Sequence, residues 1–493
     1  MLERGRTTEI LSSQEHYYSD PVVARVISQH LGWMGGAANL SPRLLDAGPT
    51  NLKRIKRDWS PEYLTVMSRN VAEQKAGRVP AKSIKPWQLP DLLRTTRGPT
   101  EIFQSLWQKD APDQKNLPLE ERKPIRTLML LDIEYFHRRL PGKVFSDQEG
   151  VFGLLEPIYQ ELARVFDEYR IQYTTVMTGK GYHFISQVPY ASKIMDELIE
   201  IGSHIDPDVL AQLTQERPHS SKRDRSVPLK AEQAHKGMGL LSQYLFFRAI
   251  RRARETSKIP VEFSDLGVEG ASFDLTPVLS RNVWNSSVGT LGSLYVKPRV
   301  RPEAYGSEVV RGMSQMVRIV RASGGRELDT WEGLVRARGS FEKVIDNLGQ
   351  AGGVIPDGSK GIRRLIADYR RSSLRQFHLA LDAEPGDAPS KWEGTYRNYA
   401  GIARGDERLK YIFENANDKL LDPNDLNYVL HTLFEQWGGN NDLRVAGHVR
   451  TWLRSAYEDP RFNWGNRFLR HYSAAQHASG WATIILGQRF GDF

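Results

Sequence analysis

The sequence predicts a sheet covered by helices, of the α/β or α+β class, from three segments in the middle of the chain. Residues 127–136 (TLMLLDIEYF) have the pattern of a buried strand, because an apolar run passes into alternation. Residues 154–170 carry apolar side chains at helical spacing. Two more strands, 173–177 and 182–188, flank a turn with two glycines, as in a β-hairpin. A strand, a helix and a hairpin in succession indicate such a layered fold.

The pattern divides the chain into three regions. Residues 1–120 are predicted to be mixed and mostly helical, either as a separate region or as part of the central module. Residues 121–305 hold the predicted strands, together with a predicted helix at 240–256 that ends in basic residues. Residues 306–493 have a helical pattern broken at paired glycines, which predicts a mostly helical C-terminal domain.

The composition narrows the class of protein. The chain of 493 residues has 68 Lys and Arg against 59 Asp and Glu, and its formal net charge of +9 favours a polyanionic partner such as nucleic acid. It has no cysteine, which excludes disulfides, a thiol nucleophile and a zinc–cysteine site. No apolar run approaches the roughly 20 residues of a membrane helix, and the first residues lack a signal core. We therefore expect a cytoplasmic protein with no membrane partner.

Two acidic residues, Asp132 and Glu134, lie two apart on the first predicted strand. Side chains alternate along a strand, so both carboxylates are expected on the same face. Two buried carboxylates repel each other and lose solvation, and a divalent cation such as Mg²⁺ compensates directly. The spacing fits equally well an edge strand on which both acids are simply solvated.

The hairpin turn, with its flanking residues 178–184 (TGKGYHF), is the second candidate site. Its glycines allow close approach of a phosphate, which Lys180 and His183 are placed to contact. No GxxxxGK[ST] P-loop pattern occurs in the chain. The alternative is an ordinary hairpin with a half-buried histidine.

A third acid, Asp274, follows an apolar stretch that ends at Phe273 and precedes a turn-prone Thr-Pro. Arg281 and Lys297 stand downstream with hydroxyl and aromatic residues between them. An acid followed by such groups suits metal, triphosphate and base contacts together. The alternative is a capped turn followed by a strand with a solvated basic face. Asp265 lies near the same motif and is the alternative acid.

In this order the three motifs resemble the catalytic core of the archaeo-eukaryotic primase superfamily, which includes primase-polymerases. Its apolar strand ending in D-x-D or D-x-E is matched by residues 130–134, its small-x-His by residues 181–183, and its apolar residue followed by Asp by residues 273–274. The resemblance covers about 180 of the 493 residues. It implies an α+β fold, in which a primase-type core with an RRM-like antiparallel sheet is followed by a mostly helical C-terminal domain.

The resemblance also implies a chemistry. Asp132, Glu134 and Asp274 would hold two Mg²⁺ or Mn²⁺ ions for nucleotidyl transfer in primer synthesis or extension. The phosphates of the nucleotide would be bound by a further set of residues, namely Lys180, Gly181, His183, Arg281 and Lys297. Many relatives carry a zinc-binding Cys/His knuckle, which this chain lacks because it has no cysteine.

The expected partners are single-stranded DNA as template and nucleoside triphosphates. A separate helicase or replication partner would have to unwind DNA, because no P-loop motor is present. Arg251 and Arg252, on the basic end of the predicted helix, and Trp464 and Arg467, in an aromatic–basic stretch of the tail, are the candidate nucleic-acid contacts. The tail alone is better explained by amphipathic core helices with solvated arginines.

Two other functions use the same residues. One is a metal-dependent nuclease or end-processing enzyme, which needs the acids but no triphosphate pocket. The other is a nucleic-acid-binding accessory protein without catalysis, although all three motifs keep reactive residue types. For a nucleotidyltransferase, Tyr135 and Tyr182 are candidates for a steric gate that distinguishes ribonucleotides from deoxyribonucleotides.

Overall fold

The computed structural model describes the central part of the chain and several shorter segments. The described residues are 20, 22–23, 26, 101–103, 105–106, 126–189, 191–205, 229–263, 267–279, 287–289, 291–292, 295, 305–306, 309, 317–323, 326–327, 330–351, 354–383 and 483–484.

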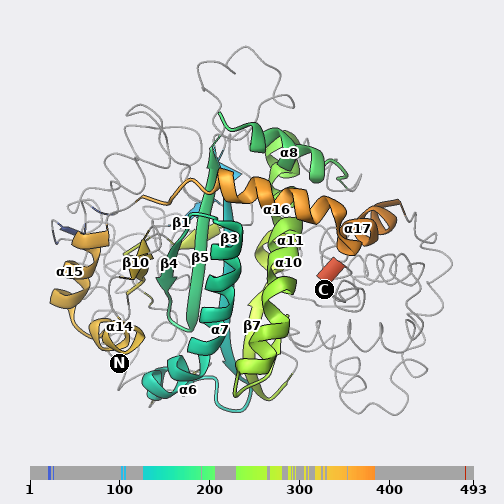
Figure 1. Cartoon of the computed structure of the whole chain (residues 1–493). Coiled ribbons are helices and arrows are strands. Elements are labelled where there is room, and N and C mark those ends of the chain that lie inside the picture. Colours follow the sequence, from blue (N-terminus) through green and yellow to red (C-terminus); the bar gives the residue numbers. More distant parts are fainter. Residues whose placement is uncertain are drawn as a thin grey trace, which may run out of the picture.

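A mixed β-sheet is the centre of the described structure (Figure 1). From edge to edge its path is β10 (Arg326–Glu327), β9 (Ile319–Ser323), β4 (Thr174–Met177), β5 (Gly181–Pro189), β3 (Arg126–His137), β7 (Glu269–Asp274) and β6 (Val261–Glu262). Off this path, β2 (Ser105–Leu106) pairs with β3. Only the β6–β7 pair is parallel among the pairs that the structure describes. A second, two-stranded sheet joins β1 (Glu101–Phe103) to β8 (Ser287–Gly289).

Helices cover one face of this sheet, and α7 and α10 run alongside each other there (Figure 1). The helices of the central segment are α6 (Lys143–Ser146), α7 (Gln148–Tyr169), α8 (Lys193–Ile201), α10 (Leu229–Thr256) and α11 (Thr276–Leu279). Those that follow are α14 (Trp331–Ala337), α15 (Phe341–Ala351), α16 (Ser359–Arg371) and α17 (Ser373–Ala383).

The core follows a β-α-β-β-α-β succession, made by β3, α7, β4, β5, α10 and β7. These four strands lie in the order β4-β5-β3-β7, each antiparallel to its neighbour. Succession and order together are those of the split βαβ motif. One face of the sheet packs on the two helices, which leaves the other face to present polar side chains.

Aromatic side chains join the sheet to its helices. Tyr182 and Phe184 of β5 project onto α7, where the ring of Tyr159 lies 4.7 Å from that of Tyr182 and 4.9 Å from that of Phe184. Farther along the sheet, Phe273 of β7 stacks on Phe246 of α10 at 4.4 Å. Such ring pairs add to the hydrophobic stabilisation that their burial already provides. They fix which face of each strand is apolar, and therefore which face carries the acids.

The α+β class expected from the sequence is confirmed, and the predicted hairpin is present as β4 and β5. The region boundary at 305 is not a boundary of the sheet, because β9 at Ile319–Ser323 pairs with β4. The helical pattern after residue 306 therefore begins with a strand, and α14 to α17 follow it. In the first region, β2 pairs with β3, so part of residues 1–120 belongs to the central sheet. Within the described residues, no helix has both the length and the apolar character needed to cross a membrane.

A buried polar chain links α10 to the two helices that follow the sheet. The Tyr369 hydroxyl lies 2.7 Å from Nδ1 of His378, and Nε2 of His378 lies 2.8 Å from Oε1 of Gln243. The amide nitrogen of Gln243 donates to the carbonyl of Thr483. Because the Gln243 oxygen only accepts, His378 donates through Nε2 and accepts at Nδ1, as a neutral imidazole.

The buried hydrogen bonds of His378 predict that the stability of the protein depends on pH. Burial, reinforced by the charges of Lys236 and Arg375, holds the pKa of His378 well below its ordinary value of 6.5. Below pH 6.5 the unfolded state therefore binds a proton that the folded state does not, and stability is lost as the pH falls. We expect this residue to lower the free energy of unfolding by roughly 1 kcal/mol between pH 6.5 and 5.5.

Denaturant unfolding at several pH values checks this. His378→Gln retains a neutral donor and acceptor, and it should show a shallower loss of stability on acidification than the wild type. Other titrating groups are common to both proteins, so their contribution cancels in the comparison. Equal pH dependence of the two proteins would contradict the assignment.

Candidate active site

The polar face of the sheet carries the acids that the sequence singled out. In the register of the sheet, Asp132 of β3 lies directly opposite His183 of β5 and opposite Asp274 of β7. Glu134, two residues further on, lies opposite Gly181 and Ser272. Directly opposed residues of antiparallel strands share a face. The three carboxylates and the histidine therefore lie on one face, across three neighbouring strands.

The alternative of a solvated edge strand is wrong. β3 lies inside the sheet between β5 and β7, and Asp132 is only 8% exposed. Glu134 is more open, with 36% of its side chain exposed. The acids thus run from a buried position to an accessible one along the same strand, which suits a site that a substrate enters from one side.

His183 connects the acids to a cation that the sequence did not single out. Its Nε2 lies 3.2 Å from Oδ2 of Asp132, and its Nδ1 lies 3.3 Å from Nη1 of Arg318. A guanidinium only donates, so Nδ1 accepts and the proton of the neutral ring sits on Nε2, which donates to Asp132. All three residues are buried. The interaction chain Asp132–His183–Arg318 therefore links a buried carboxylate to a buried cation through the imidazole.

The hairpin turn lies next to this chain. Lys180 Nζ is 3.9 Å from Oε2 of Glu134 and 6.0 Å from the ring centre of Tyr305. The Thr178 hydroxyl accepts from the amides of Lys180 and Gly181, so these amides are used within the turn. A Cβ at Gly181 would collide with the carbonyl of Ile133. Glycine at 181 thus permits close packing of β5 on β3, and the cationic group that the turn presents is Lys180.

Two further residues around the turn, Tyr295 and Arg338, were not singled out from the sequence. Tyr295 packs against Gly179, and its ring centre lies 5.8 Å from the Arg318 guanidinium carbon. Burial raises the pKa of Tyr295, which stays protonated at neutral pH. Arg338 donates to the carbonyl of Gly179, and burial lowers its pKa to about 10. For Arg318, the available signal was the segment 317–321 (VRIVR), whose arginines interrupt an apolar run.

The two steric-gate candidates are misplaced for that role. Tyr135 and Tyr182 are out of phase with the acids on their strands and face the helical layer. The Tyr135 hydroxyl donates to Glu269, 2.5 Å away, and Tyr182 packs against α7 residues Phe152 and Tyr159. Strand alternation, which places Asp132 and Glu134 together, necessarily turns their direct neighbours away.

The three carboxylates suit a divalent cation whose remaining ligands are water and substrate phosphates. Within the described residues, no group of three or more His, Asp or Glu side chains is gathered closely enough to hold a metal ion by itself. Mg²⁺ usually takes only one or two protein carboxylates and completes its shell with water and substrate phosphates. Asp132, Glu134 and Asp274 offer hard oxygen ligands of that kind on one face. The residues therefore fit a site that is completed by a phosphate-bearing substrate.

The remaining predicted residues fall into two groups. Arg281, Lys297, Trp464 and Arg467 lie outside the described residues. Arg251 and Arg252 belong to α10, on the helical layer behind the sheet. No protein-family model, curated protein or solved structure matches the chain. The function is therefore inferred from the residues of the sheet face and their geometry.

Proposed function

We propose that the acid-bearing sheet face is a nucleotidyl-transfer site that extends or begins a strand on a single-stranded DNA template, as in primases and primase-polymerases. The observation that carries the proposal is the register of β3. It sets Asp132 opposite both His183 and Asp274, so three motifs far apart in the sequence meet on one face. The β-α-β-β-α-β core is compatible with the RRM-like sheet that the resemblance implies.

The charge distribution supports a nucleoside triphosphate as the ligand. Carboxylates occupy the strand centre, while Lys180 and the buried Arg318 flank them. Phosphoryl transfer depends on positioning and on stabilising charge, and it needs no protein nucleophile. A divalent cation bound by the acids would neutralise the triphosphate and lower the pKa of the attacking hydroxyl. Lys180, which lies beside Glu134, and Arg318, which lies beyond His183, would hold phosphate oxygens.

In this proposal, His183 does not bind a phosphate directly. Both of its ring nitrogens face protein groups, Asp132 on one side and Arg318 on the other. It is therefore a positioning residue, which orients a carboxylate and a guanidinium at the same time. The bound phosphate would contact Arg318, and the histidine would keep that guanidinium in place.

The flanking cations favour this function over a nuclease. A nuclease of this type needs acids and water but no triphosphate pocket. Here Arg338 and Arg318 are both buried beside the hairpin turn, where their like charges repel. A triphosphate would relieve that repulsion with several charges on one ligand, whereas the scissile phosphodiester of a nuclease substrate carries a single negative charge.

One assay separates the candidate functions. The full chain is incubated with single-stranded DNA, nucleotides, and Mg²⁺ or Mn²⁺, once with labelled nucleotides and once with end-labelled DNA. New or lengthened oligonucleotides support nucleotidyl transfer, and a chelator should abolish them. Shortened DNA would instead establish a nuclease, and unchanged DNA with retained binding would establish the accessory role.

A further inference from the structure

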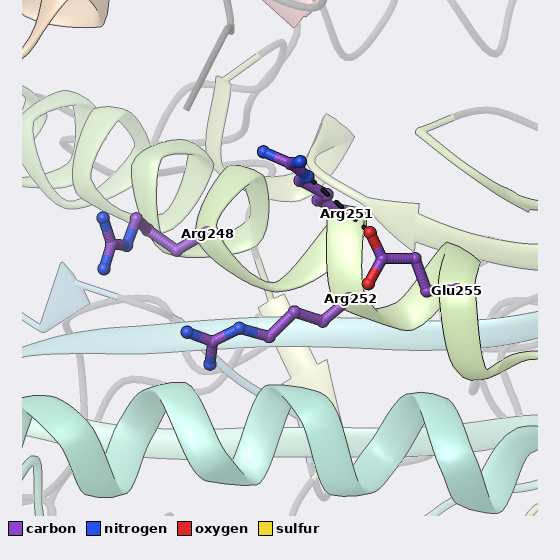
Figure 2. A pocket seen from close by; sticks show the side chains of 4 residues that line it. All are labelled: Arg248, Arg251, Arg252 and Glu255. Atoms are coloured by element: carbon purple, nitrogen blue, oxygen red, sulfur yellow. Dashed lines mark ion pairs between the residues drawn. The ribbon is translucent and has the colours of Figure 1, made fainter.

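A pocket lined by arginines lies on α10, on the layer behind the sheet and away from the acids. It has a volume of about 350 Å³, and its lining among the described residues is Arg248, Arg251, Arg252 and Glu255. The last three of these residues lie three, four and seven positions after Arg248, so all four share one side of the helix. Figure 2 shows Arg248 and Arg252 extending in the same direction from α10, with Arg251 paired to Glu255.

The pocket has more positive than negative charge. Arg252 is paired with Glu168 of α7 at 2.5 Å, and Arg251 with Glu255 at 3.7 Å. The second pair is largely exposed, so water screens it and it contributes little. Within the described part of the chain, Arg248 forms no salt bridge and is half-buried. Cations at this spacing repel one another on a helix, and a bound anion would relieve that repulsion.

The lining identifies the kind of anion. A guanidinium presents paired donors that match phosphate oxygens, and arginine is the residue best suited to recognise them. Among its described lining residues, the pocket has no aromatic or apolar side chain on which a nucleobase would stack. The arginines of the lining are therefore suited to contact phosphates, which every nucleotide carries whatever its base.

We propose that Arg248, Arg251 and Arg252 form a second nucleic-acid contact, which binds the phosphate backbone of single-stranded DNA independently of base sequence. The sheet separates this contact from the acid-bearing face, because α10 packs through Phe246 on the opposite side. The chain thus holds a strand at two places. The inference goes beyond nucleotidyl transfer and does not require it, since the contact needs neither nucleotide nor metal.

The test is binding of a labelled oligodeoxythymidine to the full chain at several salt concentrations, without nucleotides, followed by fluorescence anisotropy. Each phosphate contact on a single strand contributes about 0.7 to the slope of log affinity against log salt. Replacing all three arginines with alanine should lower the slope by roughly 2 and weaken binding about a hundredfold at 0.1 M salt. Replacing them with lysine, which keeps the charge, should retain most of the slope.

A matched control removes the same charge elsewhere. Lys360, Arg363 and Arg364 of α16 have the same spacing and are exposed. Their triple alanine variant should keep the wild-type slope. Equal weakening by both triple variants would overturn the proposal, because binding would then follow net charge alone. An unchanged slope in the α10 variant, or loss of nucleoside triphosphate binding with retained DNA binding, would also overturn it.

Discussion

Asp132→Asn is expected to lower the rate of nucleotide addition at least about a thousandfold, which corresponds to roughly 4 kcal/mol in activation free energy. The substitution removes the negative charge at the centre of the acid-bearing face. It keeps the shape of the side chain and an oxygen that accepts from Nε2 of His183, 3.2 Å away. The interaction chain to Arg318 therefore survives, and the loss reports on the carboxylate alone. Labelled-nucleotide incorporation on single-stranded DNA measures the effect.

The control makes the same chemical change at a distant place. Asp346→Asn alters an exposed aspartate on α15, and it should leave incorporation unchanged. Thermal unfolding of both variants should show that the fold is retained. Normal incorporation by Asp132→Asn would contradict the role of the sheet face, while the nucleic-acid contact on α10 would be unaffected by that result.

Glu156→Gln is expected to destabilise the protein by about 3–5 kcal/mol, because it strips the counter-charge from a buried arginine. The two guanidinium nitrogens of Arg321 each donate to a Glu156 oxygen at 2.5 Å, and only 2% of the Arg321 side chain is exposed. The guanidinium also lies 3.8 Å from the ring centre of Tyr159. Burial alone lowers the pKa of Arg321, but the Glu156 hydrogen bonds and the nearby Tyr182 outweigh it, so the pKa is raised overall.

Equilibrium denaturation measures this effect, and α7 supplies its own control. Glu149→Gln makes the identical change on the same helix, where the pair with Arg336 is exposed on both sides at 3.5 Å. It should cost less than about 1 kcal/mol. Replacing Glu156 and Arg321 together with methionine should recover much of the loss, because no charge then remains buried. A change below 1 kcal/mol in Glu156→Gln would show that water or another group compensates Arg321.

Local periodicity explains why the sheet was predictable. The run from Thr127 to Phe136 alternates from Asp132 onward, so its two faces and the shared side of the acids followed directly. The turn between β4 and β5 was indicated by its glycines. The register between β3 and β7 could not be predicted in this way. It pairs Asp132 with Asp274, and α10 and other elements lie between these two residues in the sequence.

Glycines misled the assignment of α10. The helix was predicted at 240–256 but begins at Leu229, and it contains Gly237 and Gly239. Glycine usually weakens a helix. Here a Cβ at Gly237 would collide with the carbonyl of Leu198 in α8, so the glycine permits close approach of two helices. That reason is tertiary and has no local signature.

The cations of the site were missed for a related reason. The segment 317–321 was included in a region predicted to be helical. In the structure, Arg318 lies beside His183, and Arg321 lies on the helix-covered face, where it donates to Glu156 of α7. A register shift between β4 and β9 at Thr175/Val176 accompanies this arrangement. The two arginines lie three residues apart, so strand alternation turns them to opposite faces, and the helical pattern assigned to this segment concealed that alternation.

Template-directed incorporation is the most direct measurement of the central claim, that the sheet face joins nucleotides on a DNA strand. The full chain is given oligodeoxythymidine, Mn²⁺ and each labelled nucleotide separately, as ribo- and deoxyribonucleotides. The claim predicts incorporation of adenine nucleotides only, abolished by Asp132→Asn and by chelation of the metal. Failure of every nucleotide to be incorporated, or incorporation that ignores the template base, would contradict it.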